Sequence, residues 1–107
     1  MKKRRKKDSR SKEEKAYYAW LATQPCVVSG MNCEERHHVR RRRFGAGGAL
    51  KPPDWFAIPL GERTHKEQHN KGREWFEAHY GLEESFILPL WKKYGIDKIP
   101  PEIQARL

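Results

Sequence analysis

Apolar residues in this sequence occur only in short runs, and the longest covers residues 86–91 (FILPLW). A helix that crosses a bilayer needs about 20 such residues, so we expect no membrane-spanning segment. In a chain of 107 residues, 36% hydrophobic and 35% charged side chains leave material for only one small core. Cores of this size often depend on a bound metal or another staple for their stability. We therefore expect a single small domain in which metal ligands matter.

The cellular compartment is predicted from cysteine usage and from the N-terminus. Cys26 and Cys33 are too few for a disulfide framework, so a reducing cytoplasm is the simpler expectation. The first residues are charged, but no apolar segment follows them, which argues against a secretory signal. We expect a cytoplasmic protein with no membrane partner.

Positive charge is concentrated in two blocks, and the net charge is +9. Residues 1–15 contain nine Lys/Arg against three acids, and residues 36–51 contain six against none. Two such blocks favour a polyanion partner, most often nucleic acid, because bound phosphates release counterions. Residues 1–10 are predicted to be a disordered basic tail, and a solvated tail that only keeps the protein soluble is an equal alternative.

The second basic block lies inside the predicted domain, residues 11–107, and supplies the candidate DNA contacts. Four adjacent guanidinium groups repel one another unless an anion lies among them, so this loop is expected to contact phosphates. A solvated loop is the alternative. The candidate residues are Arg36, Arg40, Arg41, Arg42, Arg43 and Lys51.

The local patterns predict an α+β fold. Ser11 and Glu14 fit a capping box that begins a helix, and Gln24-Pro25 ends it. A second capping box, from Thr64 to Glu67, predicts a helix that begins near His65. The remaining predicted segments are strands at 26–28 and 36–40 forming a hairpin, an exposed loop at 40–48, a strand at 55–58, helix breaks at Gly72 and Gly81, and a helix over 82–94 with Pro89 at a kink or at its start.

Two pairs of histidines are the centre of the functional prediction. His65 and His69 are four residues apart, so they share one helical face and can reach the same ion. Imidazole suits zinc, nickel and iron better than magnesium; the alternative is that the pair is only polar surface. His37 and His38 are adjacent on an extended segment and point to opposite sides, which favours one metal ligand and one general base. The spacing leaves open which is which.

A larger set of residues resembles a known family. These are residues 25–28, His37-His38, residues 51–54, residues 58–60, His65, His69, Gly72, Trp75, Gly81 and Leu90-Trp91. On these residues, over positions 13–95, the chain resembles the small HNH-type (ββα-metal) endonucleases of phages and prophages. The resemblance implies a β-hairpin and a helix that grip one divalent metal, cleavage of DNA, and residence in a bacterial host cell. The histidine pairs also look like the metal site of the colicin DNases.

The resemblance implies specific roles. His38 corresponds to the general base, and the metal ligands are His37, His65 and His69. Asp54 orients the base or touches the metal, although it lies eleven residues before His65, farther than the usual HNH asparagine. We expect DNA as partner, one ion of Zn, Ni, Mn or Mg as cofactor, and no small-molecule cofactor.

The chain departs from this family at positions where many relatives bind a structural zinc. They carry a Cys-x-x-Cys pair where this chain has Cys26 and Ser29, and further ligands at the positions of Gly61 and Thr64. We therefore expect no structural zinc, with Thr64 capping a helix instead. Two other functions remain: a non-catalytic nucleic-acid-binding or recombination accessory protein with an HNH-like shape, and a small zinc module that uses Cys26, Cys33 and histidines to bind a protein.

Overall fold

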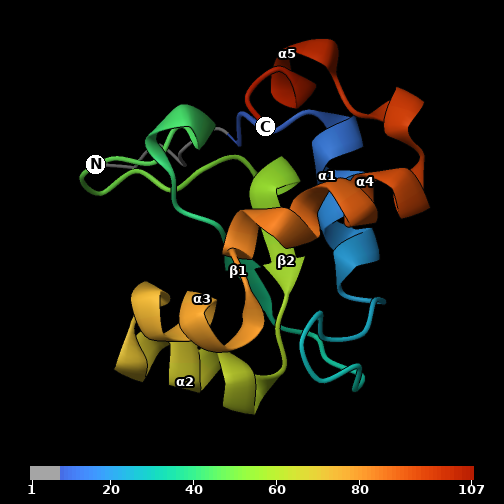
Figure 1. Cartoon of the computed structure of the whole chain (residues 1–107). Helices are drawn as coiled ribbons and strands as arrows, with labels where there is room; N and C mark the ends of the chain where they lie inside the picture. The colour runs from blue at the N-terminus through green and yellow to red at the C-terminus, as the bar shows by residue number, and fades with distance from the viewer. Residues whose placement is uncertain (1–7) are drawn as a thin grey trace, which may run out of the picture.

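The computed structural model describes residues 8–107 and has an α+β architecture, with two short strands surrounded by helices (Figure 1). Most of the predicted basic tail, residues 1–7, lies outside the described residues. No helix within residues 8–107 is long and apolar enough to cross a membrane. The strands and α-helices are α1 (Lys12–Leu21), β1 (Arg36–His38), β2 (Ala57–Pro59), α2 (Glu62–Lys71), α3 (Arg73–Tyr80), α4 (Ile87–Tyr94) and α5 (Pro101–Gln104). Four 3₁₀ turns join them: η1 (Arg42–Phe44), η2 (Asp54–Phe56), η3 (Glu83–Phe86) and η4 (Ile96–Lys98).

The sheet is a two-stranded antiparallel ladder of β1 and β2, with His37 opposite Ile58 and His38 opposite Ala57. The predicted hairpin partner of β1, residues 26–28, was wrong. Those residues belong to a tight loop that closes on itself, with Cys26 N–H donating to Met31 O and Gly30 N–H to Cys26 O. Gly30 has a φ of 72°, which permits this turn.

The core lies between the strands, α1 and α4. Trp91 donates its Nε1–H to the carbonyl of Trp55 at 2.9 Å, and Phe44 stacks on Phe56 with ring centroids 4.2 Å apart. Trp55 and Phe56 belong to η2, so the strand predicted at 55–58 begins only at Ala57. Because Phe44 is fully buried, residues 40–48 are not simply an exposed loop as predicted.

Of the two predicted helix starts, the first is confirmed and the second was wrong. Ser11 caps α1, accepting the N–H of Glu14 at 3.0 Å, as predicted, but the Glu14 carboxylate accepts the N–H of Asp54 and not that of Ser11. The prediction that Thr64 caps the next helix was wrong, because α2 begins at Glu62 with Gly61 as its N-cap. Gly72 and Gly81 end α2 and α3 as predicted, both with positive φ.

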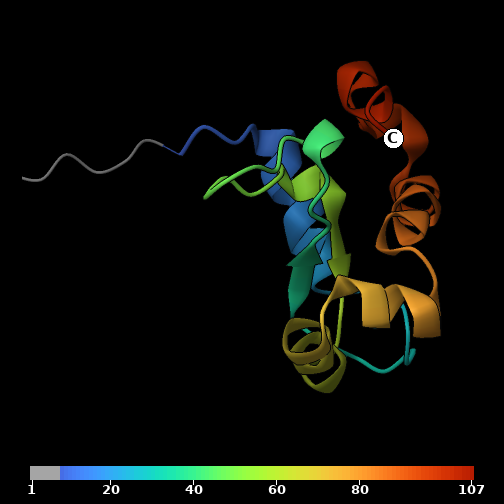
Figure 2. The ribbon, with the colours of Figure 1, turned by 60° about the vertical axis from the view of Figure 1, so that its left-hand side comes forward.

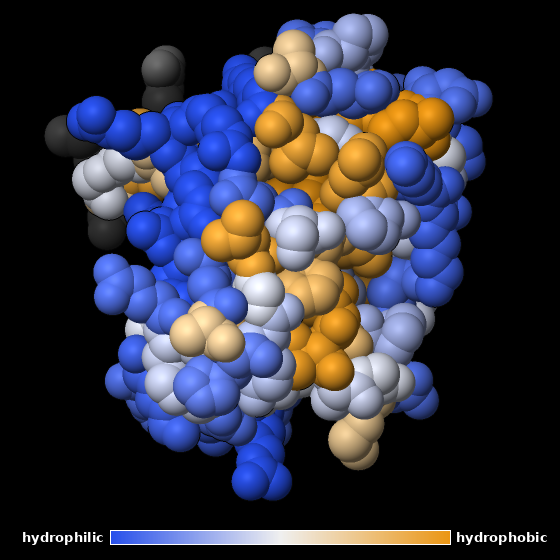
Figure 3. Space-filling view, viewed as in Figure 1, coloured by the Kyte–Doolittle hydropathy of each residue, from blue (hydrophilic) through white to orange (hydrophobic). Residues whose placement is uncertain are grey.

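The helix predicted over 82–94 ends at Tyr94 as expected, but its α-helical part begins later, at Ile87. It comprises η3 followed by α4, and Pro89 lies in the first turn of α4, where a missing N–H is tolerated. Helices α2 and α3 pack together at one end of the strands, whereas α1 and α4 contact β2 (Figures 1 and 2). The face that carries α4 is apolar, and the side of the loop that follows β1 is hydrophilic (Figure 3).

Candidate functional site

The three predicted metal ligands lie together. One nitrogen from each of His37, His65 and His69 falls within 4.8 Å of the others. His65 and His69 are one turn apart on α2, with their Nε2 atoms separated by 3.0 Å, and the rings of both lie within 6.0 Å of the His37 ring on β1. Two imidazole nitrogens bound to one ion at about 2.0 Å are themselves roughly 3 Å apart. The cluster therefore needs only small adjustments to hold a metal.

His37 Nε2 is a buried polar atom without a hydrogen-bond partner among residues 8–107. The residue is only 7% exposed. The nearest carboxylate oxygen, Glu83 Oε2, is 3.2 Å away, but it is not placed for a hydrogen bond and instead accepts from Gln68 Nε2 at 2.9 Å. A buried polar atom left unsatisfied costs about 1–3 kcal/mol. A metal ion at this nitrogen would remove that cost, so the residues fit a bound ion.

The ring of His65 is oriented by Glu35, whose Oε1 lies 3.2 Å from Nδ1. If Nδ1 carries the proton and donates it to Glu35, Nε2 faces His69 as a free ligand. Burial lowers the pKa of His65, and positive charge on His37 and His69 lowers it further, whereas Glu35 acts in the opposite direction. The neutral imidazole is the form that binds metal, so these surroundings favour the ligand state.

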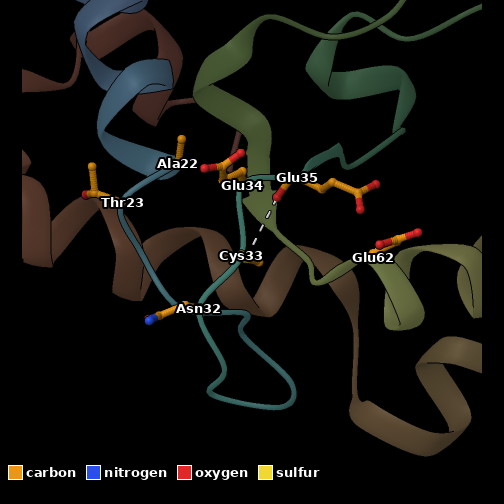
Figure 4. A pocket seen from close by; sticks show the side chains of 7 residues that line it. All are labelled: Ala22, Thr23, Asn32, Cys33, Glu34, Glu35 and Glu62. Carbon is orange, nitrogen blue, oxygen red and sulfur yellow. Dashed lines mark hydrogen bonds between the residues drawn. The ribbon is translucent and has the colours of Figure 1, made fainter.

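Glu35 and Glu83 were both missed from the sequence. Glu35 lies 30 residues from His65, and Glu83 follows His37 by more than 40, so no local spacing connects either pair. Glu35 also lines a pocket of about 680 Å³ together with Glu34 and Glu62 (Figure 4). Three carboxylates make this side of the histidine cluster acidic, and therefore unfavourable for a polyanion.

His38 is held by Asp54 on a different side of β1. Its Nε2 lies 2.8 Å from Asp54 Oδ1, and the other oxygen, Oδ2, accepts from Arg10 Nη1 at 2.9 Å. Burial of Asp54 acts to raise its pKa, but the hydrogen bonds and charges of His38 and Arg10 outweigh it, and the pKa lies below its ordinary value. An ionised Asp54 can only accept, so Nε2 carries the hydrogen and Nδ1 is left as the proton acceptor.

The two neighbouring histidines point to opposite sides of β1, as expected for an extended segment. His37 faces α2 and η3, whereas the ring of His38 lies 5.6 Å from that of Tyr18 in α1. Two roles were left open for Asp54: orienting the base or touching the metal. Asp54 lies beside His38 and outside the three-histidine group. Arg10, which the sequence assigned to the tail, was missed as a partner of Asp54.

The predicted DNA-binding residues divide into two groups. Arg36 stacks on Tyr18 and donates to its carbonyl, Arg41 pairs with Glu77 and Glu84, and Arg43 pairs with Glu84. The anion expected among the guanidiniums is therefore supplied by the protein for Arg41 and Arg43. Exposed side chains without an ion-pair partner among residues 8–107 remain at Arg40, Arg42 and Lys51.

Gly61, one of the positions where the sequence departs from the expected zinc ligands, lies beside both cysteines. A Cβ added to Gly61 would lie 3.9 Å from Cys26 Cβ and 4.0 Å from Cys33 Cβ. Cys26 is 2% exposed, and its Sγ accepts the N–H of Ser29 at 3.5 Å. Burial alone raises the pKa of Cys26, but hydrogen bonds from Ser29, Gly61 and Val28 leave it below the ordinary value. The thiol is therefore a buried member of the hydrophobic core that also accepts hydrogen bonds.

Comparison with known proteins places the chain in a family. A family model described as "Protein of unknown function (DUF968)" matches residues 2–94. The chain belongs to the DUF968 family. This DUF968 chain is also similar to a protein of Escherichia coli (strain K12) described as "Uncharacterized protein YdfU", with 36% identity over 71 residues. The match covers 66% of the chain and 20% of YdfU, so the chain spans about a fifth of that relative's length. No solved structure matches the chain.

Proposed function

We propose that this DUF968 chain is a metal-dependent endonuclease of the HNH (ββα-metal) type that hydrolyses phosphodiester bonds in DNA. The observation that carries the proposal is the group of His37, His65 and His69, which contains a buried ring nitrogen with no partner among residues 8–107. The order β1, β2, α2 and the antiparallel pairing of the strands support a ββα core. Acyl transfer or hydride transfer would need other groups of catalytic residues, whereas a metal site with three histidine ligands suits hydrolysis.

His37, His65 and His69 would hold the ion, and three protein ligands leave positions open for water and substrate. A bound divalent ion stabilises the charge that develops on the phosphate and on the leaving oxygen. Imidazole ligands favour zinc and nickel over magnesium, and their affinity for manganese is intermediate. Glu83 and Glu35 lie beside two of the ligands and would fix their orientation.

His38 is the proposed general base. Its Nδ1 takes the proton from a water molecule while the water oxygen bonds to phosphorus and the bond to the leaving sugar oxygen breaks. Asp54 keeps the Nε2–H in place and stabilises the positive charge that His38 acquires, and Arg10 keeps Asp54 ionised. Since His37 and His38 face opposite sides, the proposal requires the substrate to lie over the end of β1, where both sides can be reached.

Supercoiled plasmid and metal-stripped protein test the proposal. We expect no nicking until zinc, nickel, manganese or magnesium is added back, and no nicking by His69→Ala with any of them. His79→Ala is the matched control, because His79 lies on α3, stacks on Trp75 and is not in the cluster. DNA binding without nicking under every ion would favour the accessory protein. Stoichiometric zinc that is lost in Cys26→Ser would favour the zinc module.

A further inference from the structure

A pocket of about 510 Å³ opens beside the histidine cluster, where α2 meets α3. Figures 1 and 2 show these helices side by side at one end of the strands. The volume is within the roughly 300–1,000 Å³ that is typical of ligand sites. His37 and Glu83 line the part of the pocket nearest the cluster, and Arg40, Lys71 and Arg73 bring three positive charges to it.

These three cations are almost free of counter-charges. Arg40 donates to carbonyl oxygens, at 2.9 Å to Leu50, and Arg73 donates to the carbonyl of Arg40 at 3.0 Å. Lys71 lies over the Trp75 ring, 4.4 Å from its centroid. Within the part of the chain that the structure describes, their closest carboxylate contact is 4.0 Å, between Arg73 Nε and Glu77. Positive charges left unpaired in one pocket attract an anion.

The beginning of α3 adds to this positive potential. Gly72 and Arg73 line the pocket, and no side chain caps the helix at Gly72. The first N–H groups of a helix have no acceptor within it, and the helix dipole makes this end favourable for negative charge. Glu74 in the first turn offsets part of the charge.

The pocket also contains the unsatisfied nitrogen at which the proposed metal would bind. His37, which is 7% exposed, lines it, and its Nε2 has no hydrogen-bond partner among residues 8–107. Glu83, the nearest acid, is already bound to Gln68. His37 therefore lines the same pocket as Arg40, Lys71 and Arg73. A metal held by the histidines and an anion held by the three cations would lie close together there.

We infer that this pocket binds an internal phosphate of a polynucleotide backbone directly beside the metal ion, through Arg40, Lys71, Arg73 and the first N–H groups of α3. Guanidinium groups, an ammonium group and an uncapped helix start are the chemistry by which proteins recognise phosphate. Lys71 and Arg73 lie outside the basic block that the sequence indicated. The inference deepens the proposed nuclease function and rests on it for the class of substrate.

The first test titrates the metal-stripped full chain with inorganic phosphate and follows the backbone amide resonances by NMR. We expect saturable shifts at the N–H groups of Arg73, Glu74 and Trp75. Lys71→Gln and Arg73→Gln should each weaken binding about tenfold, the value of one charge-assisted hydrogen bond. The matched control is Lys66→Gln on α2, whose charge pairs with Glu62 at 3.1 Å outside the pocket. Absence of saturable shifts, or equal affinity in all variants, overturns the inference.

The second test uses DNA. A single-stranded oligonucleotide with only internal phosphates should bind as tightly as the same oligonucleotide with an added 5′-phosphate, and Arg73→Gln should weaken both. Selective binding of the 5′-phosphorylated form would overturn the assignment to an internal phosphate. In plasmid nicking with metal, Arg73→Gln should raise KM more than it lowers kcat. Parental KM in this variant overturns the subsite and leaves the nuclease intact, whereas phosphate binding by a chain that never nicks supports the subsite and overturns the nuclease.

Discussion

His37 and His38 are neighbours on β1, and the two sides of that strand surround them differently. Their side chains are similarly buried, with 8% and 13% exposed. His38 Nε2 is paired with an ionised carboxylate, whereas His37 Nε2 has no hydrogen-bond partner within residues 8–107 and lies among two further imidazoles. Burial alone therefore does not separate the roles of the two residues. The two residues differ in whether another protein group forms a hydrogen bond with the ring nitrogen Nε2.

This contrast predicts that substituting His37 and substituting His38 will impair different properties, metal binding in one case and proton transfer in the other. A ring that lacks a partner within the protein is suited to hold an external ion, because the ion completes its surroundings. A ring fixed by a carboxylate is suited to accept a proton, because the carboxylate sets its tautomer and stabilises its charged form.

The largest effect is expected from His37→Ala. This change removes a ligand, so affinity for zinc or nickel should fall more than about 100-fold, since loss of a group that only orients a ligand already costs about 10–100-fold. Plasmid nicking should be lost with it. Isothermal titration calorimetry on the metal-stripped protein measures the affinity, and His38→Ala is the control that should retain it. If His38→Ala loses the metal while His37→Ala keeps it, the two roles are exchanged.

The next effect is expected from His38→Ala at saturating metal. Nicking should slow by about 10²–10⁴-fold, the usual contribution of a general base, with metal and DNA affinity close to those of the parent protein. Raising the pH should partly restore the rate, because hydroxide replaces the missing base. A rate profile across pH for both proteins measures this. Parental rates for both His37→Ala and His38→Ala would rule out an HNH-type nuclease.

The parts of this site that could be predicted from sequence are local ones. His65 and His69 come together because helical periodicity depends only on spacing, and the opposite directions of His37 and His38 follow from the extended backbone. The contacts that give these residues different properties come from distant segments. Glu83 and Arg10 reach β1 and Asp54 through the packing of η3 and of the chain before α1, which no local pattern encodes.

The fold shows the same division. Helix ends at Gly72 and Gly81 were predicted, because glycine adopts a positive φ without strain. The start of α2 was not, because the helix begins at Glu62 after Gly61 with no side-chain cap, so the capping pattern at Thr64 lies within its first turn. The partner of β1 was also wrong, since strands of three residues have too little alternation to specify pairing across a long connection.

A smaller effect is expected from Arg10→Gln, which removes one of the two donors to Asp54. The folded-state pKa of Asp54 lies below the ordinary value of 3.8, so its stabilising contribution is complete above that pH and is lost as the pH falls through the lower folded value. Without Arg10 that pKa should rise, and acid unfolding should move to higher pH. Nicking near neutral pH should fall by at most about fivefold, because the Arg10 side chain is 40% exposed and His38 remains as a donor to Asp54.

Circular dichroism during acid titration measures the unfolding midpoint, and the acid side of the nicking profile should shift in the same direction. Lys12→Gln is the control, since Lys12 is exposed on α1 and donates nothing to Asp54. A shift of equal size in both variants would mean that general charge, and not the contact with Asp54, controls the pH dependence.

The smallest effect extends the comparison to the loop that follows β1, where the arginines also differ in whether the protein satisfies them. Arg41 is 15% exposed and paired with Glu77 and Glu84, whereas Arg42 is exposed with no ion-pair partner in residues 8–107.

Arg42→Gln should leave stability nearly unchanged and should reduce the slope of log K against log salt for DNA binding by about one unit, the loss of one phosphate contact. Arg41→Gln should leave that slope unchanged and should lower the free energy of unfolding by about 2 kcal/mol, because Glu77 loses its closest cation and Glu84 keeps only Arg43. Fluorescence anisotropy over a range of salt concentrations and urea unfolding separate the two outcomes. A reduced slope in Arg41→Gln would mean that this arginine leaves its glutamates to contact DNA, and that the division between satisfied and unsatisfied side chains does not hold beyond β1.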